Sequence, residues 1–338
     1  MKRIILATIA ALAVPVMLAI APPVGAKTIK LGTLAPKGSP WYDGVRDIGE
    51  AWKQISGGAV RLRIYSGGVA GDEPVMVRKM RIGQLHAAAL TGSGLSDIAP
   101  EVQALQMPMM LDSNEELDYV RSRVGPRLEA VLEKRGFKLV NWGDAGWVHF
   151  FTQSPVIRID DLKSQKLFVW SRDTALIQVW KSAGYRPVPL AATDILPSLQ
   201  TGLITAFPTT PIAALANQWF GLAKNMTDVK WAPLVGGVVI SNKTWRKISR
   251  SHQQQMIKAA RKIEARLQKA VRKLDDHAVE VMKKHGLVVH HVPPEVAAKW
   301  ETRVRALYPK LLGTIAPADM VAEVERLRDQ FRAQNKAK

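Results

Sequence analysis

The sequence contains no cysteine among its 338 residues. This absence excludes disulfides, thiolate nucleophiles and cysteine-ligated zinc, and it suits a protein that folds in an oxidising compartment without mispairing. Acidic residues are also scarce, because 29 Asp and Glu stand against 48 Lys and Arg, for a formal net charge of +19. The excess indicates either solvated helix faces or a basic surface that attracts anionic lipid or an acidic partner.

Nucleic acid is not expected as that partner. The basic pairs, such as Arg261-Lys262 and Arg272-Lys273, are spread along predicted helices. No aromatic side chains alternate with them, although proteins that bind single strands stack bases on aromatic rings. The charge therefore carries no nucleic-acid signal.

Long apolar runs are missing after the first twenty residues. Lys2 and Arg3 precede a mostly apolar run at 4–20, and small residues follow at 24–26. This is the pattern of a secretory signal peptide over 1–26. No later run reaches the roughly 18 apolar residues that a membrane-spanning helix needs. We therefore expect an exported chain that begins near Lys27 after processing.

Catalytic motifs are absent as well. The sequence has no Gly-x-Ser-x-Gly elbow, no His-Glu-x-x-His motif and no phosphate-binding loop. His290 and His291 are adjacent, so their side chains would point to opposite faces of a strand and would not share a metal ion. We expect no catalytic residue, no metal site and no cofactor. An enzyme whose pH profile is set by His149 is the minor alternative.

What is present is an alternation of short strands with helices, which predicts an α/β fold. Residues 161–211 show it best, because apolar runs at 167–170, 186–190 and 203–207 flank two segments of helical spacing. Such a unit places strand ends and helix starts along one rim, where ligands of open α/β sheets usually bind.

The length exceeds what one core usually supports, so two lobes are expected. Lobe 1 is predicted at 27–148, with returning segments from about 236–290, and lobe 2 at 149–235. Strands at 147–152 and 237–241 are predicted to cross between the lobes. A helix that starts at Ser251, with Gln254 completing a capping box, would brace both lobes, and helices within 251–334 would pack across them.

Four segments in this order resemble the solute receptors of TRAP (tripartite ATP-independent periplasmic) transporters of the dicarboxylate-receptor (DctP) type. They read LGTLAPKGSPW, GGVAGDEPVMVRKMRIGQL, DDLKSQKLFVW and LPSLQTGLITAFPTTP. The resemblance spans essentially the whole mature chain. It implies a two-lobed periplasmic binding protein, type II-like, with crossing strands and a long C-terminal helix. It also implies a receptor that serves a membrane permease of a small and a large subunit. We expect the receptor to be a monomer.

The binding residues of that family carry over poorly. An arginine that pairs with the carboxylate of the solute falls at Phe168, and a second arginine falls near Val148 or His149. The pocket asparagine aligns with Thr209, and a bulky aromatic residue aligns with Ala192. Since a charged fork of hydrogen bonds is worth about 1.5–3 kcal/mol, its loss argues against a small acid as the ligand.

We therefore predict a neutral, aromatic or lipophilic ligand in a hydrophobic cleft. In a regular strand Trp147 and Phe150 cannot both face it. Two alternatives stay open, an organic acid bound by a relocated arginine, Arg172, and a periplasmic carrier of lipid or another hydrophobic molecule. The predicted ligand-binding residues are Leu34, Trp41, Thr91, Gly92, Trp147, His149, Phe150, Phe168, Trp170, Arg172, Thr209, Thr210 and Trp231.

Overall fold

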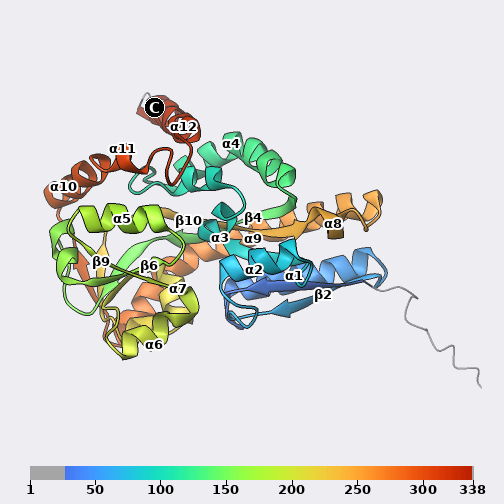
Figure 1. Ribbon diagram of the computed structural model, residues 1–338, viewed down its shortest axis with the longest axis horizontal. Helices are drawn as coiled ribbons and strands as arrows, with labels where there is room; N and C mark the ends of the chain where they lie inside the picture. The colour runs from blue at the N-terminus through green and yellow to red at the C-terminus, as the bar shows by residue number, and fades with distance from the viewer. Residues whose placement is uncertain (1–26, 337–338) are drawn as a thin grey trace, which may run out of the picture.

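The computed structural model describes residues 27–336 as an α/β protein with two mixed sheets (Figure 1). The predicted signal peptide lies outside these residues. Within them, no helix combines the length and apolarity needed to cross a membrane. In Figure 1, β2 (Val60–Tyr65) and α8 (Asn242–Trp245) lie toward one end of the molecule, and β9 (Asn225–Asp228) and α6 (Ile195–Gln200) toward the other. The two sheets form the cores of two lobes.

The sheet of lobe 1 has the strand order β2-β1-β3-β10-β4. Strand β1 is parallel to β2 and β3, while β10 is antiparallel to both β3 and β4. Its remaining strands are β1 (Lys27–Thr33), β3 (Ala87–Thr91), β10 (Pro233–Ser241) and β4 (Phe137–Trp147). The helices before β10 are α1 (Pro40–Ile55), α2 (Glu73–Arg81), α3 (Gly92–Ser96), the 3-10 helix η1 (Pro100–Gln106) and α4 (Asn114–Lys134).

The sheet of lobe 2 has the order β11-β9-β5-β8-β6-β7. Its parallel part, β8, β6 and β7, is the predicted strand and helix unit of residues 161–211. Its other strands are β11 (Val288–His291), β5 (His149–Thr152), β8 (Ala206–Thr209), β6 (Lys166–Trp170) and β7 (Arg186–Leu190). Its helices are η2 (Ile159–Ser164), α5 (Thr174–Ser182), η3 (Ala192–Asp194), α6, α7 (Pro211–Ala216) and η4 (Trp219–Gly221).

Two chain segments cross between the lobes and are bonded to each other. Strand β4 of the first sheet leads through Val148 into β5 of the second, and the residues after β9 lead back into β10. The Val148 N–H donates to the carbonyl of Ala232 at 2.8 Å, and the Trp231 N–H donates to the carbonyl of Val148 at 2.8 Å. The crossings therefore form one paired hinge, which two-lobed binding proteins use to close on a solute.

A third connection is the helix α9 (Arg250–Lys284), 35 residues long. It packs on α1 and β4 of lobe 1 and on α7 of lobe 2. The helix starts earlier than predicted, because its N-cap is Ser249, whose hydroxyl accepts from the His252 N–H at 3.3 Å, and not Ser251. The expected bracing of both lobes by one long helix is observed. The chain ends in α10 (Pro294–Arg305), α11 (Tyr308–Leu311) and α12 (Ala318–Lys336).

These last helices cover both lobes. Trp300 of α10 is fully buried and packs against Phe150 of lobe 2, with ring centroids 5.7 Å apart. Helix α12 lies along α4 of lobe 1, where Arg127 of α4 pairs with Asp319 at 2.5 Å (Figure 1). The C-terminal helices thus pack against both lobes on the outer side of the hinge.

Candidate functional site

A cavity of about 350 Å³ lies between the two lobes. Lobe 1 contributes the ends of β1 and β3, through Leu34 and Thr91, and the middle of β4. Lobe 2 contributes the ends of β6 and β8, through Trp170 and Thr209. Carboxyl ends of strands from both sheets thus meet at this cavity, which is where α/β sheets usually bind ligands.

Aromatic rings form much of its wall. Phe168 and Trp170 of β6 meet edge to face, with centroids 5.8 Å apart. Trp231 of the hinge also lines the cavity and is held by stacking on Trp180, at 5.8 Å between centroids. Trp41 of α1 is fixed by its Nε1–H, which donates to the carbonyl of Asp144 at 3.0 Å. These rings present a large, rigid apolar surface.

The charged side chains at the cavity all carry carboxyl groups. Among residues 27–336, no Lys, Arg or His lines it. Glu73, Asp144, Asp173 and Glu264 do. The electrostatic character of the cleft is therefore opposite to that of the chain as a whole, which is strongly basic.

Glu73 is the most buried of these carboxyl groups, at 1% exposure. It accepts hydrogen bonds from the Thr91 N–H at 2.7 Å, from the Thr91 hydroxyl at 2.7 Å and from the Gly94 N–H at 2.8 Å. Burial raises the pKa of Glu73 to about 7, although these hydrogen bonds favour the ionised form. Glu73 thus ties α2 to the end of β3 and occupies the hydroxyl of Thr91.

Asp144 belongs to a buried ion network behind the cavity. Its carboxylate pairs with Arg121 of α4 and, at 2.9 Å, with Arg272 of α9. The side chain of Gln268 donates to it at 3.0 Å. Asp118 binds the same two arginines, at 3.2 and 2.7 Å. These contacts join β4, α4 and α9 and neutralise Asp144 within the protein.

Asp173 and Glu264 have no such partners within 27–336. Burial, and then the nearby charge of Asp97, raise the pKa of Asp173 to about 6. Burial is also the main reason that the pKa of Glu264 rises to about 7, with Arg121 opposing it. Both groups therefore hold their protons more readily than exposed carboxylates do, and both offer oxygen atoms to a ligand.

Arg172 does not line the cavity. Its side chain is 62% exposed, and its Nε lies 3.8 Å from the Asp97 carboxylate of lobe 1. This contact bridges the outer edges of the two lobes. Another contact between the lobes joins the carboxylate of Asp72 in lobe 1 to the N–H of Ala192 in lobe 2, at 3.3 Å. Arg172 therefore lies outside the cavity, at a contact between the two lobes.

Of the predicted ligand-binding residues, those that line the cavity are Leu34, Trp41, Thr91, Phe168, Trp170, Thr209 and Trp231. Gly92 lies outside the lining, because Thr91 to Ser96 form the cap and first turn of α3 and not an open turn. A side chain at Gly92 would meet the amide of Gln106, at 1.9 Å from its nitrogen. The absence of a side chain at Gly92 therefore leaves room for the Gln106 side chain and not for a ligand.

The aromatic residues predicted in the crossing strand also lie outside the cavity lining. Phe150 is fully buried, between Trp231 at 5.1 Å and Trp300 at 5.7 Å. The Nε1–H of Trp147 donates to the side chain of Asn114 at 3.2 Å, which turns the ring into lobe 1. Both faces of this segment are packed in protein, so neither residue reaches the cleft.

The two remaining predicted residues are held by the backbone of lobe 2. The Nδ1 of His149 lies 3.3 Å from the carbonyl of Thr227, and burial lowers the pKa of His149 to about 4. Thr210 is fully buried, and its hydroxyl caps α7 by accepting from the Ala213 N–H at 3.4 Å. Neither lines the cavity.

The polar lining formed by Glu73, Asn141, Asp144 and Glu264 was not predicted from the sequence. Glu73 opens a helix and Glu264 lies on a long charged helix, which are ordinary solvated positions in sequence. Only the alternation of apolar residues around Asn141 marks it as buried in β4. Trp219, which also lines the cavity, carried no positional signal of its own.

Two lobes on separate sheets, a paired hinge and a cavity at the strand ends define a solute-binding protein of the two-lobed type. The chain belongs to family 7 of the bacterial extracellular solute-binding proteins, whose model matches residues 31–313. The predicted TRAP-receptor resemblance is thereby confirmed, and the chain is a receptor for small solutes and not an enzyme.

Known relatives agree with this assignment. A solute-binding protein of Roseobacter denitrificans is 26% identical over 240 residues, which cover 69% of this chain and 72% of that protein. The sugar acid binding protein of Advenella mimigardefordensis, solved with galactonate, has a TM-score of 0.84 at 19% identity, over 90% of this chain and 98% of its own. A TRAP periplasmic solute-binding protein of Ralstonia eutropha, solved with (S)-2-acetolactate, has a TM-score of 0.83 at 21% identity, over 90% and 99%.

Proposed function

We propose that this receptor captures a neutral, aromatic or lipophilic small solute in its interlobe cavity. It acts as a monomer in the periplasm, after removal of the signal peptide, and delivers the solute to a permease of a small and a large membrane subunit. The observation that carries the proposal is the lining of the cavity, in which no cationic side chain of residues 27–336 takes part and Phe168 stands where the family resemblance places an arginine.

The electrostatics argue against an acid. A carboxylate transferred from water into this cavity would find no Lys or Arg of residues 27–336 in its lining, and an unpaired buried charge costs several kcal/mol. It would also meet Asp173 and Glu264, which repel it when ionised. Galactonate and acetolactate, the solutes of the two solved relatives, are acids. The proposed specificity therefore differs from theirs.

The hydrogen-bonding groups favour a solute that donates. The carboxyl oxygens of Asp173 and Glu264 accept when these groups are ionised, and Glu264, whose pKa is about 7, can also donate when it is protonated. The hydroxyl of Thr91 and the amide of Gln106 are already engaged with Glu73 and Gln103. Thr209 lines the cavity with a hydroxyl that can donate or accept. A flat solute with one or a few O–H or N–H groups would satisfy these acceptors and lie against Phe168 and Trp170.

The two alternatives are less well supported. For the organic-acid alternative Arg172 would have to leave the Asp97 contact and enter the cavity, which it does not line. For the lipid-carrier alternative, a volume of about 350 Å³ lies at the low end of small-molecule pockets, near 300 Å³. A compact aromatic solute suits this volume better than a lipid chain.

The test is a binding screen with matched variants. The protein is assayed by thermal shift and calorimetry against neutral aromatic alcohols, amides and phenols, and in parallel against succinate and galactonate. Neutral aromatics should bind, their affinity should fall at least about tenfold in Trp170→Ala through the loss of a ring contact, and Arg172→Ala should bind them like the wild type.

Tight binding of a small carboxylate that is lost in Arg172→Ala would overturn the proposal in favour of an acid receptor. A long-chain lipid found by mass spectrometry in the gently purified protein would overturn it in favour of a carrier. Thr209→Val serves as the conservative variant, because it removes a hydroxyl while keeping the shape of the side chain.

A further inference from the structure

A second, larger concavity lies at the opposite end of lobe 1. It has a volume of about 1040 Å³ and lies at the start of β1 and β4 and the end of β10, through Lys27, Phe137 and Ser241. The solute cavity lies instead at the other ends of β1 and β3. An occupant of this concavity, which we call the basic groove, would therefore leave the interlobe cleft free.

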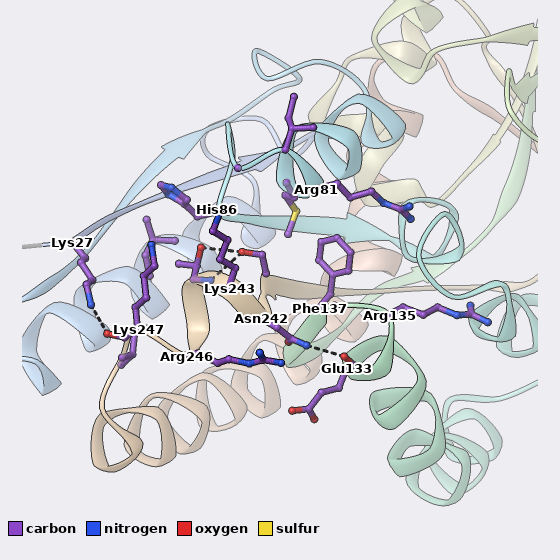
Figure 2. Close-up of a pocket in the computed structure, with 18 of the residues that line it drawn as sticks. Lys27, Arg81, His86, Glu133, Arg135, Phe137, Asn242, Lys243, Arg246 and Lys247 are labelled. Carbon is purple, nitrogen blue, oxygen red and sulfur yellow. Dashed lines mark hydrogen bonds between the residues drawn. The ribbon is translucent and has the colours of Figure 1, made fainter.

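Positive charge dominates the basic groove (Figure 2). Lys243, Arg246 and Lys247 come from α8 and the turn after it, and Lys134 comes from the end of α4. All four side chains are exposed, and none forms an ion pair with another residue of 27–336. Two further cations, Arg81 and Arg135, line the other side in Figure 2, although Arg135 is already paired with Glu101 at 2.8 Å.

The acidic content of the groove is small. Glu133 is the one carboxylate in its lining, as far as residues 27–336 are concerned, and it is already paired with Lys138 at 2.8 Å. His86 adds no charge near neutral pH, because burial and the charges of Lys30 and Lys247 lower its pKa. The groove therefore holds four exposed cations, Lys134, Lys243, Arg246 and Lys247, that have no carboxylate partner among residues 27–336.

The positions of these residues are only partly explained by local helix structure. Arg81 and Lys134 lie in the last turns of α2 and α4, where basic residues offset the helix dipole. Arg246 is the C-cap of the short helix α8, where the same effect applies, but Lys247 follows it outside the helix. Lys27 also lines the groove, and its ammonium group donates a hydrogen bond to the carbonyl of Lys247 (Figure 2).

An exposed apolar side chain lies among these charges. Ile82 lines the groove and is 64% exposed, although large apolar residues normally avoid such exposure. Cations beside an exposed apolar residue are the combination that binds the interface of an anionic membrane, where the charges meet phosphates and the apolar group enters the acyl boundary. A free phosphate ion would make no use of Ile82, whereas a lipid interface offers both phosphates for the cations and an acyl boundary for the apolar side chain.

We propose that the basic groove docks the receptor on anionic phospholipid headgroups at the membrane surface. The phosphates lie against Lys243, Arg246 and Lys247, and Ile82 inserts at the rim. Because the groove lies at the far end of lobe 1 from the cavity, the docked receptor still opens and closes on its solute. Such docking would hold the receptor in the plane in which a membrane permease operates.

The experiment is vesicle co-sedimentation of the purified protein. Vesicles of phosphatidylcholine with about one third phosphatidylglycerol should bind it at low salt, pure phosphatidylcholine vesicles should not, and about 0.5 M NaCl should abolish binding. The groove variant Lys243→Gln/Arg246→Gln/Lys247→Gln should bind at least about tenfold more weakly. Ile82→Ser should weaken binding without any change in charge.

The matched control is Lys258→Gln/Lys262→Gln/Lys269→Gln. These lysines are exposed on α9, form no ion pair with residues 27–336, and remove the same number of charges. The control should lose less than about twofold in vesicle binding. Unfolding curves of both variants check that each is folded, and the mutated side chains leave the Lys247 carbonyl in place.

Several results would overturn the proposal. The first is that the groove variant and the control lose vesicle binding equally. The second is that the groove variant binds vesicles as well as the wild type does. The third is that the wild type does not bind anionic vesicles. A groove variant that binds vesicles normally but no longer binds an acidic protein segment would assign the groove to a protein partner instead. None of these results depends on which solute the interlobe cavity holds.

Discussion

Phe168 and Trp170 meet edge to face at the cavity, with ring centroids 5.8 Å apart and planes inclined by 63°. They are two residues apart on β6, so their side chains lie on the same face of the strand. Phe168 is 2% exposed and packs with the apolar core of lobe 2, while Trp170 is only partly buried. The Phe168 ring thus belongs to the core of lobe 2 and also lines the cavity.

Replacement of Phe168 by alanine should lower the free energy of unfolding by about 3–5 kcal/mol, because the loss of a buried ring leaves a cavity. Urea denaturation followed by circular dichroism measures the change. The matched control is Phe220→Ala, since Phe220 is only half-buried beside the same core and should lose less. A loss below about 1 kcal/mol in Phe168→Ala would contradict the packing described above.

The buried ion network predicts a strong effect at Asp144. Asp144→Asn removes the charge between Arg121 and Arg272 and leaves two arginines with Asp118 as their shared partner. Breaking a buried pair in this way should cost about 3 kcal/mol in unfolding free energy. Thermal and urea denaturation at neutral pH would measure it.

The control for Asp144 is Asp47→Asn. Asp47 also pairs with arginines, one from its own helix and Arg266 of α9, but the Arg266 side chain is 69% exposed. An exposed pair contributes less than about 1 kcal/mol. If both variants lost the same stability, the Asp144 network would contribute no more than a surface ion pair.

Gly146, beside the hinge, is a position where we expect any side chain to lower stability. Gly146, just before the crossing, has φ +94°, and a Cβ placed there would lie 2.7 Å from the Oδ2 of Asp275 on α9. Gly146→Ala should therefore lower unfolding free energy by about 1–3 kcal/mol through backbone strain and the displacement of Asp275. Calorimetric melting would show the loss.

Gly83→Ala isolates the contribution of this contact. Gly83 has φ +79°, but a Cβ added there would meet no atom of residues 27–336 within 4 Å, so its replacement introduces backbone strain alone. Gly146→Ala should be the more destabilising of the two. Equal losses would mean that α9 moves away from the hinge without cost.

His149 predicts a pH dependence of stability. Its pKa is lowered to about 4 in the folded protein, mainly by burial, while the ordinary value of 6.5 applies to the unfolded chain. Between these values the unfolded chain binds more protons, so stability is present above pH 6.5 and is lost as pH falls toward 4. A difference of this size corresponds to roughly 3 kcal/mol.

Unfolding by urea at a series of pH values from about 4 to 8 would measure this effect. The stability of His149→Asn should change less over that range than the stability of the wild type. His277→Asn serves as the control, because His277 is exposed on α9 and its replacement should leave the wild-type dependence unchanged. An unchanged pH dependence in His149→Asn would show that other groups dominate it.

Part of the candidate site was readable in the sequence and part was not. The position of Phe168 followed from a family resemblance that spans the strand, and the structure places it at the cavity. Trp147 and Phe150 were predicted from the same kind of pattern, but they pack in protein. Alternation along a strand distinguishes its two faces, yet it does not tell a face that meets a cleft from one that meets another helix.

The acidic lining of the cavity depends on contacts between distant segments. Glu73 is buried because Thr91 and Gly94, far along the chain, donate to it. Glu264 reaches the cavity because α9 packs against α1 and β4. In the sequence both residues look like solvated helix positions, since the local pattern holds no information about which distant element covers them.

Local periodicity was enough to establish the α/β class, the long bracing helix and the first crossing near 147–152. The second crossing was predicted at 237–241, but those residues lie within β10 of lobe 1, and the chain returns between β9 and β10. Three other features became visible only once the chain was folded: the cavity has no cation among residues 27–336, Arg172 meets Asp97 outside it, and basic residues gather in a groove at the far end of lobe 1. Those features arise where segments remote in sequence pack together, and packing sets which charges share a surface.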